Sequence, residues 1–308
     1  MRKIIDNTII RILCFPLILL KRIYFSWLVK HDPIKFTKYK YKLEYNYDVN
    51  LKSPQTVVDK YLYLEFFSDT SLWTICADKY RVREYVMSKG WGEILNDLYD
   101  AFETPDELNI DILPDQFVIK ANNGCGSVLV VTDKSQLDVP KLKKEISLWL
   151  MDDYGLRTAQ PHYSRIKPYI VVERYLKQQN HLSLWDYKIT CINGKPIVIN
   201  VLMERKFING QPSHEFDEAF YDPDWNLIKY CGSENDFSLT KPKSLDTMLA
   251  ISRDLSADFP FVRVDLYEIN NKPVFGELTF TPGFDKEDLN LDLGKMLDIS
   301  MYIHNVGR

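Results

Sequence analysis

The sequence has no pair of cysteines in a CxxC motif, and its five cysteines are far apart along a chain of 308 residues. An odd number of widely spaced cysteines argues against a disulfide framework and a zinc knot, which indicates a protein of the reducing cytoplasm. The chain also lacks an excess of basic charge, because 39 Lys and Arg stand against 43 Asp and Glu. This balance gives no general attraction for nucleic acid, so any bound anion must be held locally. The cysteines are Cys14, Cys76, Cys125, Cys191 and Cys231.

No apolar run is long enough to span a membrane. Residues 9–29 are strongly apolar, but Arg11, Pro16, Lys21 and Arg22 interrupt them, and a spanning helix needs about 20 consecutive apolar residues. No small-residue cleavage site follows, which argues against a signal peptide. Two interpretations stay open for this basic, aromatic segment. It could lie at the inner face of an anionic cell membrane, or it could pack as a helix on its own protein.

The common glycine-rich phosphate motifs, GxxxxGK[ST] and GxGxxG, are absent. The segment FVIKANNGCGS, residues 117–127, nevertheless indicates a strand that ends at Lys120 and runs into a loop with two glycines. The backbone amides of such a loop, together with Ser127, can close over the phosphates of a nucleotide. A loop with two glycines is more often a plain hairpin, so this segment alone does not decide between the two.

The first half of the chain indicates a helical lobe that precedes a smaller mixed one, without internal repeats. Residues 30–55 lack clear periodicity and are interpreted as a connecting segment, whereas residues 56–112 are mostly helical in pattern, with one helix ending at Gly90. Strand, loop, strand, helix and strand then follow in order. The predicted units are an N-terminal segment (1–30), an N-terminal lobe (31–112), a small central lobe (113–178) and a C-terminal lobe (179–308).

Two hairpins in the C-terminal lobe turn at Asn193-Gly194 and at Asn270-Asn271. The second hairpin carries Asp265 and Glu277 among apolar neighbours, where an unpaired carboxylate is costly to bury. Carboxylates on adjacent strands can face the same side and share Mg²⁺ with nucleotide phosphates. The alternative is a salt bridge from Arg263 to one of them.

The apolar run YIVVERYL stops at Glu173 and could present backbone groups to an adenine edge, although a strand that ends in Glu-Arg is commonplace. In this order and spacing, the features resemble the ATP-grasp superfamily, and within it the branch named for teichuronopeptide biosynthesis (TupA-like ATP-grasp). The resemblance covers residues 56–300 and implies an α+β ATP-grasp fold, in which two α+β lobes clasp a nucleotide behind a mostly helical N-terminal lobe. It rests on the strings DKYRVREYV, LPDQFVIKANNGCGS, PHYSRIKPYIVVERYL, DYKITCINGKP, FVRVDLY and FGELTFTPG.

The resemblance implies a site for ATP and Mg²⁺. Lys120 would hold the α- and β-phosphates, and Arg263 would steady the transferred phosphoryl group. Asp265 and Glu277 would be the magnesium carboxylates. Many members of the superfamily have Asn as a further metal ligand two residues after the second carboxylate. Here that position is Thr279, whose hydroxyl can still serve as a weaker ligand.

The remaining implied contacts surround the nucleotide. Lys188 and Arg205 would be basic positions along the phosphate side, with Arg205 among the catalytic residues. The loop over the phosphates would contain Asn123, Gly124, Gly126 and Ser127. The adenine hinge would consist of Glu173, Arg174, Tyr175 and Leu176. Asp186 would contact the ribose.

The activity that the resemblance implies is that of an ATP-dependent carboxylate–amine ligase. A substrate carboxylate attacks the γ-phosphate of ATP to give an acyl phosphate, and an amine then displaces phosphate to form an amide. The acceptor would be a carboxylate-bearing sugar or glycan, such as a uronic acid, and the amine that of an amino acid or peptide. The setting would be the assembly of bacterial surface polysaccharide, such as capsule or teichuronopeptide.

Two other classes stay open. A nucleotide-binding accessory protein could keep the fold without turnover; Thr279 and the basic N-terminal segment favour it, while Lys120, Asp265 and Glu277 argue against it. A glycosyltransferase, which also uses Mg²⁺ with acidic residues, is the less favoured alternative. His162 invites a catalytic role as well, although a histidine before a β-rich run is more often a structural hydrogen-bonding residue.

Overall fold

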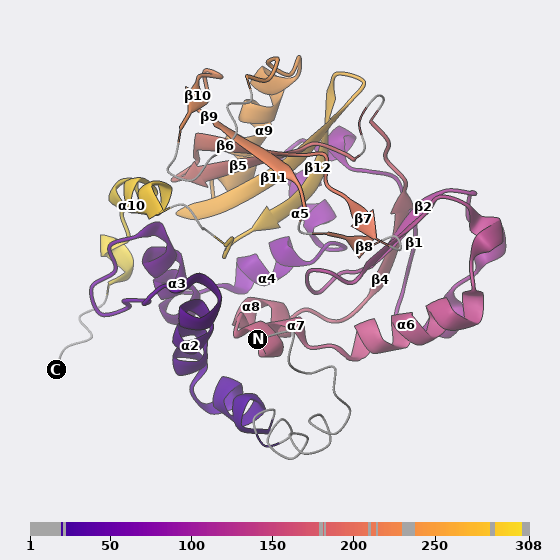
Figure 1. Ribbon diagram of the computed structural model, residues 1–308, viewed down its shortest axis with the longest axis horizontal. Helices are drawn as coiled ribbons and strands as arrows, with labels where there is room; N and C mark the ends of the chain where they lie inside the picture. Colours follow the sequence, from indigo (N-terminus) through magenta and orange to yellow (C-terminus); the bar gives the residue numbers. More distant parts are fainter. Residues whose placement is uncertain are drawn as a thin grey trace.

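The computed structural model describes two large β-sheets and a small two-stranded one, with helices around them (Figure 1). Of the apolar segment 9–29, only residue 20 and residues 23–29 lie in the described part, and they are helical. Cys14 and Cys231 lie outside it, and the other three cysteines are free thiols. No helix in the described part is long and apolar enough to cross a membrane. The described residues are 20, 23–178, 181, 183–208, 211–213, 215–229, 238–283 and 287–303.

The prediction that residues 30–55 only connect other elements is wrong, because they contain helix α2 (Pro33–Tyr45). Asp32 caps the first turn by accepting a hydrogen bond from the Lys35 amide. Pro33 occupies the first helical position, where its missing N–H needs no partner. In the stretch KYKYKLEY, lysines alternate with aromatic residues, and this period of two masks the helical period of 3.6.

The next helices begin and end at the signals that the sequence carries. α3 (Val57–Phe67) starts with a capping box in which the side chains of Thr56 and Asp59 each accept a hydrogen bond from the other's backbone amide. α5 (Val82–Ser88) stops before Gly90, whose φ of +85° favours glycine. The predicted C-cap is therefore confirmed. Two short helices, α4 and η2, accompany them: α4 (Ser71–Ala77) and η2 (Gly92–Ile94).

The smaller sheet has four antiparallel strands in the order β1-β4-β2-β3. Helix α6 packs against β2, and it borders this sheet in Figure 1. The sheet starts before the predicted lobe boundary at 112/113, because β1 pairs with β4 as an edge strand. The elements of this region are β1 (Leu98–Phe102), η3 (Pro105–Glu107), η4 (Ile110–Ile112), β2 (Phe117–Ala121), β3 (Val128–Val131), η5 (Lys134–Gln136), α6 (Val139–Met151), α7 (Tyr154–Thr158), α8 (Pro161–Ser164) and β4 (Ile170–Arg174).

The larger sheet has six strands in the order β10-β9-β6-β5-β11-β12, all antiparallel to their neighbours. Both predicted hairpins are confirmed. Asn193 and Gly194 have φ of 50° and 73°, and Asn270 and Asn271 have φ of 52° and 62°, the left-handed values of a tight hairpin turn. The elements are β5 (Asp186–Ile192), β6 (Lys195–Met203), β7 (Phe207–Ile208), β8 (Gln211–Pro212), β9 (Asp217–Tyr221), β10 (Leu227–Ile228), α9 (Leu245–Ser256), β11 (Phe261–Ile269), β12 (Lys272–Thr279), α10 (Glu287–Met296) and η6 (Ser300–Tyr302).

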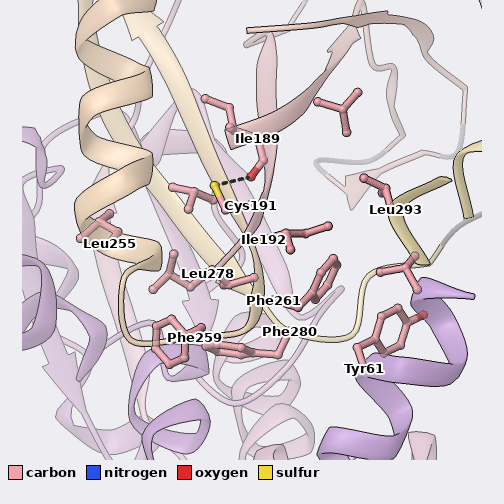
Figure 2. Packing of buried hydrophobic residues seen from close by; sticks show 14 of the residues in the cluster. Tyr61, Ile189, Cys191, Ile192, Leu255, Phe259, Phe261, Leu278, Phe280 and Leu293 are labelled. Atoms are coloured by element: carbon pink, nitrogen blue, oxygen red, sulfur yellow. Dashed lines mark hydrogen bonds between the residues drawn. The ribbon is translucent and has the colours of Figure 1, made fainter. Parts of the chain in front are cut away.

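The two largest hydrophobic cores are separate, which shows that the two large sheets belong to different lobes. The larger core joins the N-terminal helices to the six-stranded sheet and α9. Figure 2 shows this packing, in which Tyr61 of α3 lies beside Phe261 of β11, with ring centroids 5.5 Å apart. The smaller core lies between the four-stranded sheet and α6 and includes Phe117 and Ile146. The N-terminal helices are therefore part of the same packed body as the C-terminal sheet.

Candidate active site

Three charged side chains form a row across the edge of the six-stranded sheet. Lys188 of β5 lies opposite Asp265 of β11, and Asp265 lies opposite Glu277 of β12. Directly opposed residues of neighbouring strands project to the same face of a sheet. The hairpin therefore brings the two predicted metal carboxylates together, with a lysine beside them.

A bulge in the hairpin sets the direction of Glu277. The register of β11 and β12 shifts between Asp265 and Leu266, next to Gly276. A Cβ atom on Gly276 would lie 2.8 Å from the carbonyl oxygen of Asp265, so no larger residue fits without a shift of the backbone. Glycine at this position lets the strands approach closely beside the carboxylate.

Asp265 is bound by two cations. Its side chain is 1% exposed, and it accepts hydrogen bonds of 2.6 and 2.7 Å from Nε and Nη2 of Arg263. Lys188 donates to the same carboxylate. The salt bridge from Arg263, considered above as the alternative to metal binding, is thus present. The two interpretations are compatible, because a nucleotide could draw the cations to its phosphates.

Glu277 is held more loosely. Its side chain is 42% exposed, with Arg263 at 3.7 Å and Lys79 at 4.0 Å. Thr279 donates a hydrogen bond of 3.2 Å to it. Burial alone would raise the pKa of Glu277, but Lys79, Lys188 and Arg263 outweigh it and lower the pKa to about 2. The carboxylate is therefore ionised at neutral pH.

The four-stranded sheet supplies a second charged pair. Lys120 of β2 donates a hydrogen bond of 2.8 Å to Glu173 of β4, and both side chains are mostly buried. A cavity of about 20 Å³ lies beside this pair, with room for about one water molecule. Its walls come from both lobes, since Lys79 and Gly276 line it together with Lys120 and Glu173. The predicted phosphate lysine thus borders the same space as the strand of the metal carboxylates.

The predicted phosphate loop is held at its start by a buried asparagine and at its centre by close packing. Asn122, fully buried, donates hydrogen bonds to Asp78 and to the carbonyl of Lys167. Gly124 packs so closely on the ring of Tyr154 that a Cβ atom would approach the ring to 2.6 Å. Gly126 has a φ of +90°. Each glycine is thus required for a different reason, one by contact and one by backbone conformation.

Several of the predicted nucleotide contacts point elsewhere or make other bonds. Asn123 is buried and donates to the carbonyl of Asp152. Arg174 forms an ion pair of 3.3 Å with Asp97 and is half exposed. The carbonyl of Ser127 accepts the Ala121 amide. Tyr175 and Leu176 follow β4 and are partly buried.

Asp186 and Arg205 lie beside the charged row. The Asp186 carboxylate is 3.6 Å from Lys188. Burial raises its pKa, while Lys188 and Arg205 act in the opposite direction. The guanidinium of Arg205 stacks on Phe216, 4.7 Å from the ring centroid, and donates to the carbonyl of Ser213. Asp186 therefore lies next to the row, and its contact with a ribose stays a prediction.

The structure also singles out a residue that the sequence reasoning did not assign. Lys79 precedes α5, lies near Glu277, and donates to the carbonyl of Gly124 in the phosphate loop. Its neighbour Asp78 fixes its position by binding Asn122. Lys79 belongs to the string DKYRVREYV, but it is 45 residues from the loop, so only the fold reveals the contact.

We expect Lys79→Met to weaken the binding of Mg-ATP about 10- to 100-fold, the effect of losing a charge-assisted hydrogen bond to phosphate. Isothermal titration calorimetry with a non-hydrolysable ATP analogue measures this change. Lys89→Met is the matched control, because Lys89 is similarly buried and paired with Asp258 but is remote from the loop. Equal affinities for the two variants would remove Lys79 from the site.

The charges of the site suit a magnesium–nucleotide complex. Four cations and four carboxylates balance each other. The described part of the chain holds no group of three His, Cys, Asp or Glu side chains that could bind a metal by itself. Magnesium often takes one or two carboxylates and completes its shell with phosphate oxygens, which fits Asp265 and Glu277. The eight residues are Lys79, Lys120, Lys188, Arg263, Glu173, Asp186, Asp265 and Glu277.

His162 does not belong to this cluster. Its Nδ1 lies 2.8 Å from Oε1 of Glu65, and both side chains are fully buried. Trp73 and Phe280 pack against its ring edge to face. The residue thus links α8 to α3 inside the core, which supports the structural role over the catalytic one.

Two α+β lobes that bring lysines and carboxylates to a shared space define a nucleotide-binding protein of the ATP-grasp class. The family model of TupA-like ATPgrasp matches residues 63–297, and the chain belongs to this family. The predicted family and α+β fold class are thereby confirmed.

Solved structures with some similarity include D-alanine–D-alanine ligase from Bacillus anthracis complexed with ATP, at 16% identity, covering 68% of this chain and 55% of that chain, with a TM-score of 0.40. An L-amino acid ligase from Bacillus licheniformis has 16% identity, coverage of 70% and 43%, and a TM-score of 0.42. D-cycloserine synthetase DcsG has 13% identity, coverage of 78% of each chain, and a TM-score of 0.43. The aligned part thus spans little more than half of the first of these ligases. No curated protein matches the chain.

Proposed function

We propose that the protein is an ATP-dependent carboxylate–amine ligase that acts through an acyl phosphate. One observation carries this proposal. The pair Lys120–Glu173 lines a cavity whose other wall includes Gly276, and Gly276 is the neighbour of Glu277 in the row Lys188–Asp265–Glu277 of the other lobe. Phosphoryl transfer depends mostly on positioning and on neutralising charge, and such a cluster of cations and carboxylates supplies both.

The side chains of the site would have different roles in phosphoryl transfer, according to their positions. Lys120 and Lys79 would hold the phosphates, the first at the end of β2 and the second against the phosphate loop. Arg263, aligned by Asp265, would steady the transferred phosphoryl group. Magnesium, held by Asp265 and Glu277, would screen the negative charge between the phosphates.

An acyl phosphate must be kept from water, so the site needs a cover. The loop 121–127 suits this role because its centre is tied to Lys79 through the carbonyl of Gly124. A phosphate that attracts Lys79 would compete for that bond. Nucleotide binding would therefore be coupled to rearrangement of the loop.

The acceptor in this proposal is a carboxylate-bearing sugar or glycan, such as a uronic acid, and the amine comes from an amino acid or peptide. The family supports a role in bacterial surface-polysaccharide assembly, and the basic, apolar N-terminal segment supports a location at the inner face of the cell membrane. The intact set of Lys120, Asp265 and Glu277 favours turnover over a purely accessory role.

Magnesium-dependent release of ADP by the purified protein tests the proposal. Uronic acids, sugar nucleotides and glycans are each combined with a panel of amino acids, and each partner is also omitted in turn. We expect continued ADP release to require both a carboxylate and an amine, since the acyl phosphate formed with the first ADP occupies the site until the amine displaces its phosphate. Binding of Mg-ATP without release under any combination, glycan-linked acceptors included, would favour the accessory protein.

A further inference from the structure

The first described helix has two apolar faces, of which only one is used for packing. Residues 23–31 are helical, and Leu28 and Val29 are buried against Phe36 of α2 and Ala159. Phe25 joins this contact, with its ring 5.6 Å from that of Phe36. This face alone is enough to dock the helix on the protein.

The opposite face is apolar as well and is left exposed. Three residues of this helix, together with Leu20 before it, follow the spacing i, i+3, i+4 and i+7, and each is about half exposed or more. We call these four residues the apolar stripe. The six tryptophans of the chain are all described, and Trp27 is the one among them with an exposed side chain. The stripe consists of Leu20 (62% exposed), Ile23 (58%), Tyr24 (48%) and Trp27 (52%).

Positive charge surrounds the apolar stripe, although the chain as a whole is negative. Residues 20–45 contain seven Lys or Arg and two Asp or Glu, in a protein of net charge −4. Lys30, Lys35 and Lys38 form no ion pair with any residue of the described ranges. Lys30 lies on the same helix as Tyr24 and Trp27, and Lys35 and Lys38 lie on α2, which packs against that helix. Lysines without a charge partner near exposed Trp and Tyr are characteristic of binding in the headgroup region of an anionic membrane.

We propose that the apolar stripe and the lysines beside it dock the protein on an anionic lipid surface. The helix lies in the plane of the interface, with the apolar stripe below the headgroups and Leu28 and Val29 on the protein. A second copy of the chain is the less suitable occupant, because the same cluster of lysines would then face itself.

Docking through the apolar stripe would also fix the distance between the membrane and the candidate active site. This step rests on the proposed function. Helix α2 starts beside the docking helix and ends near the segment that follows β12, where Tyr45 lies against Gly283. Tyr41 of α2 bonds Tyr61, which donates to the carbonyl of Pro282. Thirteen helical residues span roughly 20 Å, so docking would hold the segment that follows β12 within roughly that distance of the docked helix. A glycan carried on a lipid is an acceptor that suits this arrangement.

Vesicle sedimentation with the full chain tests the docking surface. The probes are neutral phosphatidylcholine vesicles and vesicles with one part of phosphatidylglycerol in three. We expect binding to the anionic vesicles alone, weakened by salt. Ile23→Glu should lower the partition coefficient at least about tenfold. Combined Lys30→Glu, Lys35→Glu and Lys38→Glu should lower it about 100-fold or more. The matched control is Ile112→Glu, because Ile112 is 66% exposed in the other lobe.

Three results would overturn the docking surface: equal binding to both kinds of vesicle, equal losses for Ile23→Glu and Ile112→Glu, or no binding at low salt. Concentration-dependent dimerisation that Ile23→Glu removes, without vesicle binding, would assign the apolar stripe to a second copy. ADP release is measured on the same variants with soluble substrates. Because that assay needs no membrane, failure of the ligase and failure of the docking surface are distinguishable.

Discussion

Glu277→Gln is expected to lower ADP release at least about 10²-fold, the order of effect seen when one preorganised electrostatic contact to a transition state is removed. Glutamine keeps the shape of the side chain but removes the negative charge that would hold magnesium. Because Glu277 is 42% exposed and only loosely paired, the fold should survive the change. A coupled assay of ADP measures the loss of activity, and thermal unfolding of the wild type and of Glu277→Gln shows whether the fold is retained.

Glu103→Gln is the matched control for this variant. Glu103 is 44% exposed and pairs with Lys167, so the substitution, the exposure and the type of partner are the same, while the site is different. Wild-type activity in Glu103→Gln and its loss in Glu277→Gln would tie the effect to the charged row. Undiminished activity in Glu277→Gln would show that the carboxylate has no part in the reaction.

The pH dependence of stability is a second way to compare the wild type with Glu277→Gln. The folded state lowers the pKa of Glu277 from 4.5 to about 2, because the nearby cations outweigh burial. Its ionised form therefore stabilises the wild type above pH 4.5, and this contribution is lost as the pH falls to about 2. Wild type and Glu277→Gln should differ in urea midpoint at pH 7 and converge at low pH. Solvent screening keeps the difference small.

The local signals in the sequence were sufficient for much of the fold. Asn193-Gly194 and Asn270-Asn271 can turn a hairpin because their residues tolerate positive φ, and such chemistry is legible without tertiary contacts. Helix α2 was missed, because its lysines and tyrosines alternate with a strand-like period while its cap and proline carry the helical signal. Strand β1 escaped prediction for a different reason. Its place in a sheet depends on pairing with β4, more than 60 residues away.

The candidate site was predictable where strand pairing alone brings residues together. Asp265 and Glu277 face each other because one hairpin fixes their register, and Arg263 is two residues from Asp265 on the same face. Lys79 was not predictable, since its approach to Gly124 depends on the buried contact between Asp78 and Asn122. The burial of Asn123 was equally hidden, because the loop sequence does not show that both of its asparagines turn inward.

Asp265→Asn is expected to destabilise the protein by about 3–5 kcal/mol, the usual cost of removing one partner from a buried ion pair. Asp265 is 1% exposed and accepts from both Arg263 and Lys188, so its neutralisation leaves two cations without their common anion. Urea unfolding at pH 7 measures the loss. The two carboxylates that are predicted to bind magnesium should thus differ sharply, with Asp265 needed for the fold and for activity and Glu277 mainly for activity.

A second substitution shows whether unpaired charge or lost packing causes the destabilisation by Asp265→Asn. Lys188→Met in the Asp265→Asn background removes one of the two stranded cations while keeping an aliphatic chain of similar length. If uncompensated charge is the cause, the double variant should be more stable than Asp265→Asn alone, although ADP release stays abolished. A double variant that is less stable still would mean that Lys188 stabilises the sheet through its packing. The row Lys188–Asp265–Glu277 would then be held together by the strands, and its charges would serve the nucleotide alone.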